Sequence, residues 1–252
     1  MIGYLRAFYK TVSLFFLLFG YVLYNALKAL FFGHDYTWTL RTRRKFARLL
    51  LWFLNVEFEQ AGTAPQGAYI FIGNHRSYMD PVLAHQDMMA LPVAKAEIGN
   101  WPIIGWGVKI SGVLLVKREN KGSRKKTRQN IVTTIKDGHS VLVYPEGTSH
   151  DRATTIDFKP GTFRIAAENN IPIVPVAVEF KDPTDAFIND DQFVAHFFNS
   201  FRKPTMYAKV RFGEPIVSEN AEELLQRAKG WIDRELVEMR EEFGLPVGGK
   251  AE

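Results

Sequence analysis

The chain has 252 residues and is 46% hydrophobic, which is sufficient for one α/β domain with an additional segment. It contains no cysteine, which excludes disulfides, thiolate metal sites and catalysis through an acyl-cysteine. The 32 lysines and arginines outnumber the 27 acidic residues, and the net charge of +5 favours an anionic partner.

The first predicted element is an apolar N-terminal helix. Residues Val12 to Phe32 are almost wholly apolar, and a helix of this length spans ~30 Å, which matches the hydrocarbon core of a bilayer. Asn25 and Lys28 count against simple spanning, and no signal-peptide cleavage pattern follows. We therefore favour a helix that dips into one leaflet. The alternative is a helix that packs as core on the rest of the protein, but Leu14–Phe19 is more apolar than that requires.

A second helix is predicted from Tyr36 to Leu54, basic in its middle and rich in leucine and aromatic residues toward its end. Such a helix suits the surface of an anionic leaflet, with arginines among the headgroups and aromatic rings below them. We expect residues 1–60 to form a two-helix membrane-associating element and residues 61–252 to form a separate domain, with a short linker at Gly62 to Gly67.

From residue 61 onward, strand-like runs alternate with helical stretches. This alternation predicts an α/β fold with a mainly parallel mixed sheet flanked by helices. An amphipathic helix is expected near Ala221 to Phe243, where apolar residues recur at helical spacing. The clearest predicted strands are Ala68–Ile72, Val113–Val116, Val141–Tyr144, Ile173–Phe180 and Tyr207–Phe212.

The segment Gly73 to Pro81 follows the first of these strands and places a histidine and a carboxylate a short turn apart. A carboxylate bound to one imidazole nitrogen fixes the tautomer and leaves the other nitrogen free to accept a proton near neutral pH. This pairing requires His75 in a loop and Asp80 at the start of the next helix, where Pro81 suits the first turn. The pattern predicts a general base with its orienting acid, against the alternative of two ordinary surface or capping groups.

A second polar turn, Tyr144 to Thr148, also follows a strand of the buried type. Ligands of open α/β sheets gather at the carboxyl ends of the strands, so we expect the two turns to face one crevice.

Four segments, taken in order, resemble the motifs of the glycerolipid acyltransferases, and most of all those of the 1-acyl-sn-glycerol-3-phosphate acyltransferase family. The resemblance covers about residues 68 to 216. Its four main segments are Asn74-His75-x-Ser77-x-x-Asp80, Gly112 to Arg118, Tyr144 to Thr148 and Ile171 to Val176, and its smaller ones are Lys95-x-Glu97, Pro102-x-x-Gly105 and Phe212 to Ile216.

The resemblance implies that residues 61–252 are an acyltransferase domain. Such a domain moves a fatty acyl group from acyl-CoA or acyl carrier protein to the free hydroxyl of 1-acyl-sn-glycerol-3-phosphate, which gives phosphatidic acid. His75 would take the hydroxyl proton while Asp80 holds the imidazole, without a covalent intermediate and without a cofactor. A positioned base contributes about 10²–10⁴ in rate, and backbone amides near Gly147 or after His75 are candidates for stabilising the oxyanion.

The substrate-binding residues also follow from the motifs. Arg118 is the first candidate for the acceptor phosphate and Lys95 the second, because a guanidinium binds phosphate as a bidentate fork. The alternative for Arg118 is a solvated arginine in a basic loop. Glu146 and Thr148 would position the acceptor or brace the loop, and Glu146 would alternatively pair with Arg118. The full expected set is Asn74, Ser77, Lys95, Arg118, Glu146, Gly147 and Thr148.

The chain departs from the family at the third motif. There, Glu-Gly-Thr is commonly followed by an arginine that is thought to hold the substrate phosphate, whereas this chain continues with Ser149, His150, Asp151 and Arg152. Either Arg152 reaches the same place, or the acceptor is another lysolipid such as lyso-ornithine lipid.

The expected partners are membrane lipids at the N-terminal helices, a lysolipid and an acyl donor, with no nucleic acid. The basic run Lys121 to Arg128 would face solvent, the leaflet or the acidic donor. The expected location is the cytoplasmic face of the cell membrane. No metal ion is expected, because the histidines other than His75 lack ligand spacing. Two further classes stay open: a thioesterase or phospholipase-type hydrolase, and a non-catalytic lipid-binding protein.

Overall fold

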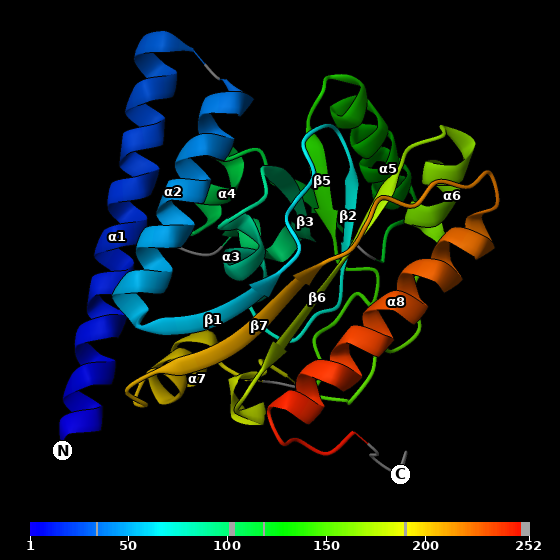
Figure 1. The fold of residues 1–252 in the computed structure, drawn as a ribbon. Coiled ribbons are helices and arrows are strands. Elements are labelled where there is room, and N and C mark those ends of the chain that lie inside the picture. Colours follow the sequence, from blue (N-terminus) through cyan, green and yellow to red (C-terminus); the bar gives the residue numbers. More distant parts are fainter. Residues whose placement is uncertain (34, 101–103, 118, 189–190, 248–252) are drawn as a thin grey trace.

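The computed structural model describes residues 1–33, 35–100, 104–117, 119–188 and 191–247. Its centre is a seven-stranded sheet in the order β1-β7-β6-β2-β5-β3-β4 (Figure 1). Neighbouring strands are parallel except for β6 and β7, which are antiparallel. The predicted α/β fold with a mainly parallel mixed sheet flanked by helices is confirmed.

The strands are β1 (Val56–Ala61), β2 (Ile70–Gly73), β3 (Ala90–Lys95), β4 (Leu114–Val116), β5 (Ser140–Val143), β6 (Ile173–Phe180) and β7 (Met206–Phe212). The α-helices are α1 (Ile2–Phe32), α2 (Tyr36–Leu54), α3 (Asp80–His85), α4 (Ile104–Ile110), α5 (Lys121–Lys136), α6 (Gly161–Glu168), α7 (Phe193–Ser200) and α8 (Ala221–Glu242).

All five strands predicted from the sequence are present, but β1 and β3 were missed. In β3, Pro92 interrupts the strand pattern, because a proline supplies no N–H to the ladder. β1 is an edge strand of alternating glutamates and apolar residues that follows α2 directly through Asn55, which has a left-handed backbone with φ 55°. The predicted division after residue 60 falls inside β1, and the division of the chain into two parts stays a prediction.

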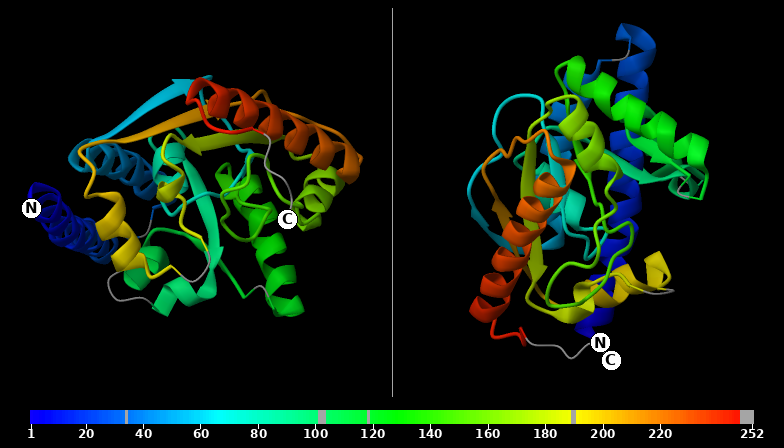
Figure 2. Two further views of the ribbon diagram at one scale, coloured as in Figure 1. Left: turned by 90° about the horizontal axis from the view of Figure 1, so that it is seen from below. Right: turned by 90° about the vertical axis from the view of Figure 1, so that its right-hand side faces the viewer.

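Helices cover both faces of the sheet, as the alternation of side chains along β2 shows. Phe71 lies in one apolar core, to which α1, α2, α3 and α7 contribute. Ile70 and Ile72 lie in a second core, to which α5, α6 and α8 contribute. Successive side chains of a strand point to opposite faces, so these cores lie on opposite sides of the sheet. Figures 1 and 2 show α1 and α2 on one flank and α5, α6 and α8 on the other.

Helix α1 is docked against the rest of the protein along most of its length. Near its start, Arg6 Nη1 donates a hydrogen bond of 3.0 Å to the carbonyl of Arg202. Lys10 Nζ donates to the carbonyl of Leu54, and Thr42 Oγ1 donates to Asn25 Oδ1 at 3.0 Å. The polar residues of this helix therefore face protein. Its other side exposes an apolar stripe made of Leu5, Phe8, Val12, Phe16, Phe19, Leu23, Leu27 and Leu30.

A buried ion network joins the sheet to α8. Glu179 on β6 lies between two arginines, with Oε2 3.1 Å from Arg76 Nη2 and 3.2 Å from Arg240 Nη1. All three residues are buried, with exposed fractions of 1% for Arg76, 4% for Glu179 and 6% for Arg240. Because one carboxylate is the shared counter-ion of two buried guanidinium groups, Glu179 has more influence on stability than a surface acid.

The network gives a stability prediction. Glu179→Ala leaves two buried arginines without a counter-ion, and breaking a buried pair in this way costs about 3–5 kcal/mol. Glu238→Ala is the control, because Glu238 is 60% exposed and pairs at the surface with Arg211, so its loss costs at most about 1 kcal/mol. Urea unfolding in detergent measures both changes. Equal losses in the two variants would contradict the assigned role of Glu179.

Candidate active site

The sequence-predicted turns meet along one edge of the sheet. Strands β2, β5, β3 and β4 are adjacent and parallel, so their carboxyl ends share an edge. This places His75 after β2, the turn Tyr144 to Thr148 after β5, and Lys95 at the end of β3. Lys95 is exposed there. Arg118 and Pro102 lie outside the described residues.

His75 and Asp80 form the expected pair. His75 Nδ1 is 2.8 Å from Asp80 Oδ2, and Asp80 is the first residue of α3, with Pro81 in the first turn. The same carboxylate oxygen accepts the backbone N–H groups of Arg76 at 2.6 Å and Ser77 at 2.8 Å. The sequence expectation of a loop histidine and a helix-starting carboxylate therefore matches the geometry.

These contacts fix the protonation pattern of the pair. Asp80 Oδ2 accepts both amide N–H groups and also acts as the acceptor toward the imidazole, which places the ring proton on His75 Nδ1. His75 Nε2 is then unprotonated and able to accept a proton. The side chain of His75 is 24% exposed while that of Asp80 is fully buried, so the base is accessible and its orienting acid is not.

Tyr144 forms the platform on which the imidazole lies. The rings of His75 and Tyr144 stack with centroids 4.5 Å apart and an angle of 18° between their planes. Burial, with a smaller contribution from Asp80, raises the pKa of Tyr144 well above its usual value, so the phenol stays neutral. Gly73 makes room for this ring, because a Cβ there would lie 2.8 Å from Tyr144 Cε1.

Glu146 and His150 support the loop that carries His75. Glu146, 3% exposed, accepts the backbone N–H of His75 at 3.1 Å, and its Oε2 lies 3.0 Å from His150 Nε2. His150 Nδ1 is 3.0 Å from Arg76 Nη1 and accepts the N–H of Arg152 at 3.2 Å. Both neighbours of Nδ1 are donors, so His150 carries its proton on Nε2, facing Glu146.

Two other motif residues are built into the structure. The side-chain amide of Asn74 forms two hydrogen bonds with the backbone of Val178, at 2.8 and 2.9 Å, and ties the end of β2 to β6. Ser77 is fully buried, and its backbone N–H belongs to the Asp80 cluster. Contacts of Asn74 and Ser77 with a substrate stay predictions.

Sequence reasoning missed one cation in the site, Lys159. Gly147 has φ +76°, and a Cβ there would collide with the ammonium group of Lys159, which therefore lies directly beside this turn. The N–H of Lys159 also donates to Pro145 at 3.0 Å. In the sequence, the feature that could have indicated Lys159 is its position directly before Pro160, the residue that precedes the first residue of α6. Thr148 is exposed beside this cation.

Ser149 occupies the position directly after Thr148, where the family commonly has an arginine. Ser149 Oγ donates to the carbonyl of Phe187, and His150 turns inward as described above. The side chain of Arg152 is exposed. Among the described residues, no group of three or more histidines and acidic residues is arranged to hold a metal ion.

The chain is similar in sequence to known acyltransferases. A family model described as acyltransferase matches residues 55–179. A lyso-ornithine lipid O-acyltransferase of Pseudomonas aeruginosa is 28% identical over 196 residues, which are 75% of this chain and 75% of that protein. The chloroplastic 1-acyl-sn-glycerol-3-phosphate acyltransferase BAT2 of Brassica napus is 28% identical over 159 residues, which are 58% of this chain and 46% of that protein.

The fold has a counterpart among solved structures. The crystal structure of the 1-acyl-sn-glycerophosphate acyltransferase PlsC from Thermotoga maritima superposes with a TM-score of 0.66 at 19% identity, and covers 91% of this chain and 98% of that one. The catalytic-pair geometry and the sequence matches define an acyl-transferring enzyme. Residues 55–179 of the chain form a domain of the acyltransferase family.

The role of Asp80 is tested by Asp80→Asn. Asparagine is close in shape but has no charge to hold the Nδ1–H tautomer, so we expect kcat for acyl transfer to fall by about 10²–10⁴. Asp157→Asn is the control, because Asp157 is exposed, and it should retain wild-type kcat. Steady-state kinetics on both variants, with circular dichroism to verify folding, measures the effect. A folded Asp80→Asn enzyme with normal kcat would rule out the orienting role.

Proposed function

We propose that the protein transfers a fatty acyl group from an acyl thioester to the free hydroxyl of 1-acyl-sn-glycerol-3-phosphate, and so forms phosphatidic acid. The observation that carries this proposal is the His75–Asp80 pair, in which a partly exposed imidazole is held by a buried carboxyl group that accepts two backbone amides. The motifs and the acyltransferase relatives support the reaction class.

In this reaction, His75 Nε2 removes the proton of the lysolipid hydroxyl as the oxygen attacks the thioester carbonyl. The new C–O bond forms, the C–S bond breaks, and the thiol leaves with the proton that the imidazolium returns. The imidazolium is stabilised by Asp80, which lies 2.8 Å from Nδ1. No group of the enzyme becomes acylated, and the two substrates suffice without a cofactor.

The oxyanion and the acceptor phosphate need positive charge close to His75. The amides of Arg76 and Ser77 donate to Asp80, and that of His75 donates to Glu146, so these three are already occupied. We assign the oxyanion contact to the Lys159 ammonium beside Gly147. For the phosphate we propose Lys95, which lies at the end of β3, two strands from β2 at about 4.8 Å per strand. The role of Arg118 stays a prediction.

Lyso-ornithine lipid is the second candidate acceptor. Ser149 stands where the family commonly has a phosphate-binding arginine, and the Pseudomonas relative named for this activity matches 75% of the chain. The serine at this position and the similarity to this relative both favour an acceptor whose negatively charged group is bound without an arginine after Thr148.

The reaction is tested by thiol release from acyl-CoA by the purified enzyme in detergent. We expect release only with 1-acyl-sn-glycerol-3-phosphate, and a fall of about 10²–10⁴ in His75→Ala. His139→Ala is the matched histidine control, because His139 precedes β5 at the other end of the sheet. Parallel assays use acyl carrier protein as donor and lyso-ornithine lipid as acceptor. Release without any acceptor would identify a hydrolase and contradict the proposal.

We also propose that the enzyme sits in one leaflet on the cytoplasmic face of the cell membrane. In the described part of the chain, α1 is the one helix long and apolar enough to cross a bilayer. However, the hydrogen bonds of Arg6, Lys10 and Asn25 to the rest of the protein hold this helix against the folded domain. A helix held sideways in this manner favours insertion of its exposed apolar stripe into the lipid surface over crossing.

This placement predicts how α1 variants bind lipid. Phe16→Asp/Phe19→Asp puts two charges on the apolar stripe and removes two phenyl groups worth ~1.5–3 kcal/mol each on burial, so binding to anionic vesicles should weaken at least about 100-fold. Val217→Asp/Val247→Asp alters two exposed valines elsewhere and is the control. Vesicle sedimentation measures the partition coefficients. Equal partitioning of both double variants would refute insertion through the stripe.

A further inference from the structure

We propose that the groove between α5 and α6 binds the nucleotide end of the acyl-CoA donor, with Arg128 and Arg164 as its phosphate contacts. The inference rests on the proposed acyl transfer and identifies acyl-CoA as the donor that reacts at the same site. The two residues concerned are Arg128, in the basic run Lys121 to Arg128, and Arg164, in α6. Neither takes part in the proposed proton transfer at His75.

The groove leads away from the catalytic pair. A cavity of about 470 Å³ begins at Tyr144 and Gly147 and continues beside Ile131 of α5. A second cavity, of about 760 Å³, lies between α5 and α6 and reaches Glu168 and Asn169. The two cavities share three lining residues, Arg128, Gly161 and Arg164. The two cavities therefore adjoin, and the inner one reaches Tyr144, the ring on which His75 stacks.

The two cavities differ in the chemistry of their walls. The inner one has an apolar floor that includes Val116, Ile131 and Val143, which suits a thioester and the slender arm that carries it. The outer one adds Lys125 to the two shared arginines. Its concave shape and its size, within the ~300–1,000 Å³ of typical small-molecule sites, favour a nucleotide over a protein surface.

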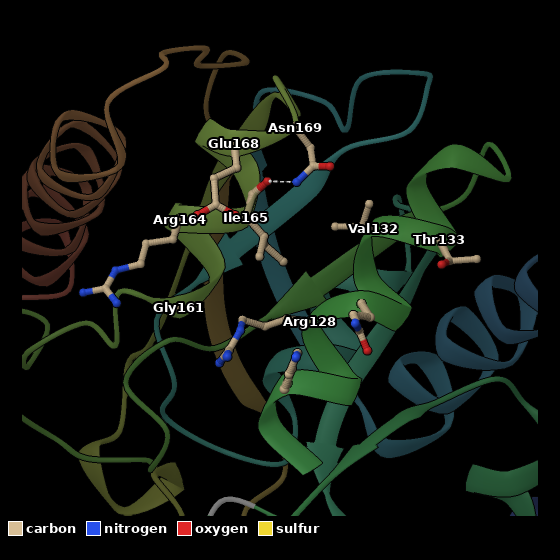
Figure 3. Close-up of a pocket in the computed structure, with 10 residues that line it drawn as sticks. Arg128, Val132, Thr133, Gly161, Arg164, Ile165, Glu168 and Asn169 are labelled. Carbon is tan, nitrogen blue, oxygen red and sulfur yellow. Dashed lines mark hydrogen bonds between the residues drawn. The ribbon is translucent and has the colours of Figure 1, made fainter. Parts of the chain in front are cut away.

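The two arginines are available to an anion. Figure 3 shows Arg128 reaching from α5 toward the start of α6 at Gly161, while Arg164 extends from the outer side of α6. Neither forms an ion pair with a carboxylate of the described residues, whereas Arg211 on the sheet contacts Glu235, Glu238 and Glu242.

An unpaired guanidinium is well suited to phosphate, because its planar fork matches two phosphate oxygens. CoA carries phosphates on both sides of its ribose, which suits a pair of arginines on facing helices. At the far end, Glu168 and Asn169 offer hydrogen-bonding groups to the uncharged base. In Asn169, the amide N–H₂ donates to the carbonyl of Ile165 at 2.9 Å, which orients its oxygen away from the helix (Figure 3).

The groove is tested by calorimetric titration with adenosine 3′,5′-bisphosphate, which carries the nucleotide phosphates without the acyl arm. We expect the wild-type protein to bind it and Arg128→Ala/Arg164→Ala to bind at least about 10-fold more weakly. Lys136→Ala/Arg234→Ala also removes two exposed cations, and it should bind like wild type. This measurement needs no acyl transfer, and His75→Ala should retain full affinity.

Steady-state kinetics then distinguish acyl-CoA from acyl carrier protein as the donor that uses this groove. In Arg128→Ala/Arg164→Ala, we expect KM for acyl-CoA to rise at least about 10-fold with kcat retained, while acyl-pantetheine, which has no phosphate, is used as by wild type. Absence of bisphosphate binding by wild type, or equal binding by both double variants, would overturn the proposal. A raised KM for acyl carrier protein with an unchanged KM for acyl-CoA would overturn it in favour of carrier-protein docking.

Discussion

The site depends on one buried carboxylate oxygen that accepts three donors. Asp80 Oδ2 receives the N–H groups of Arg76 and Ser77 and faces His75 Nδ1, all within 2.8 Å. Burying a carboxylate is costly unless it is hydrogen-bonded, so the chain between His75 and α3 bends until these donors converge on Oδ2, whereas Oδ1 has no hydrogen-bond partner in the described part of the chain. The same bend that brings these donors to Oδ2 also orients the imidazole, so the fold of this turn and the geometry of the proposed base depend on one constraint.

The bend is also held by Arg76, the residue that follows His75. Its side chain is buried and links His150 in the turn after β5 to Glu179 on β6. Glu146 in that same turn then accepts the N–H of His75. The loops after β2 and β5 are thereby joined through charged and polar contacts, and His150 serves this network in a chain that lacks the usual arginine after Thr148.

Local features of the fold and site were predictable, and features that require distant segments were not. The His75–Asp80 pair and the start of α3 follow from residues six positions apart or fewer, and five strands follow from their own apolar runs. The stacking of Tyr144 on His75, and the place of Lys159 beside Gly147, arise from segments brought together by the parallel sheet. Strand β3 was not predicted, because Pro92 interrupts its strand pattern. Pairing with β5 on one side and β4 on the other offsets the hydrogen bond that the proline cannot donate.

The sites proposed for the two substrates lie on opposite faces of the sheet. The helices that expose apolar residues, α1 and α2, pack with the core on one face, and the basic groove between α5 and α6 lies on the other. His75 follows the carboxyl end of β2, a central strand, and therefore lies between the two faces. A lysolipid with its chains in the leaflet would arrive from the side of α1, and a polyanionic water-soluble donor would arrive from the side of α5. Because an anionic leaflet repels a polyphosphate, a donor site turned away from the membrane lets both substrates meet at one imidazole.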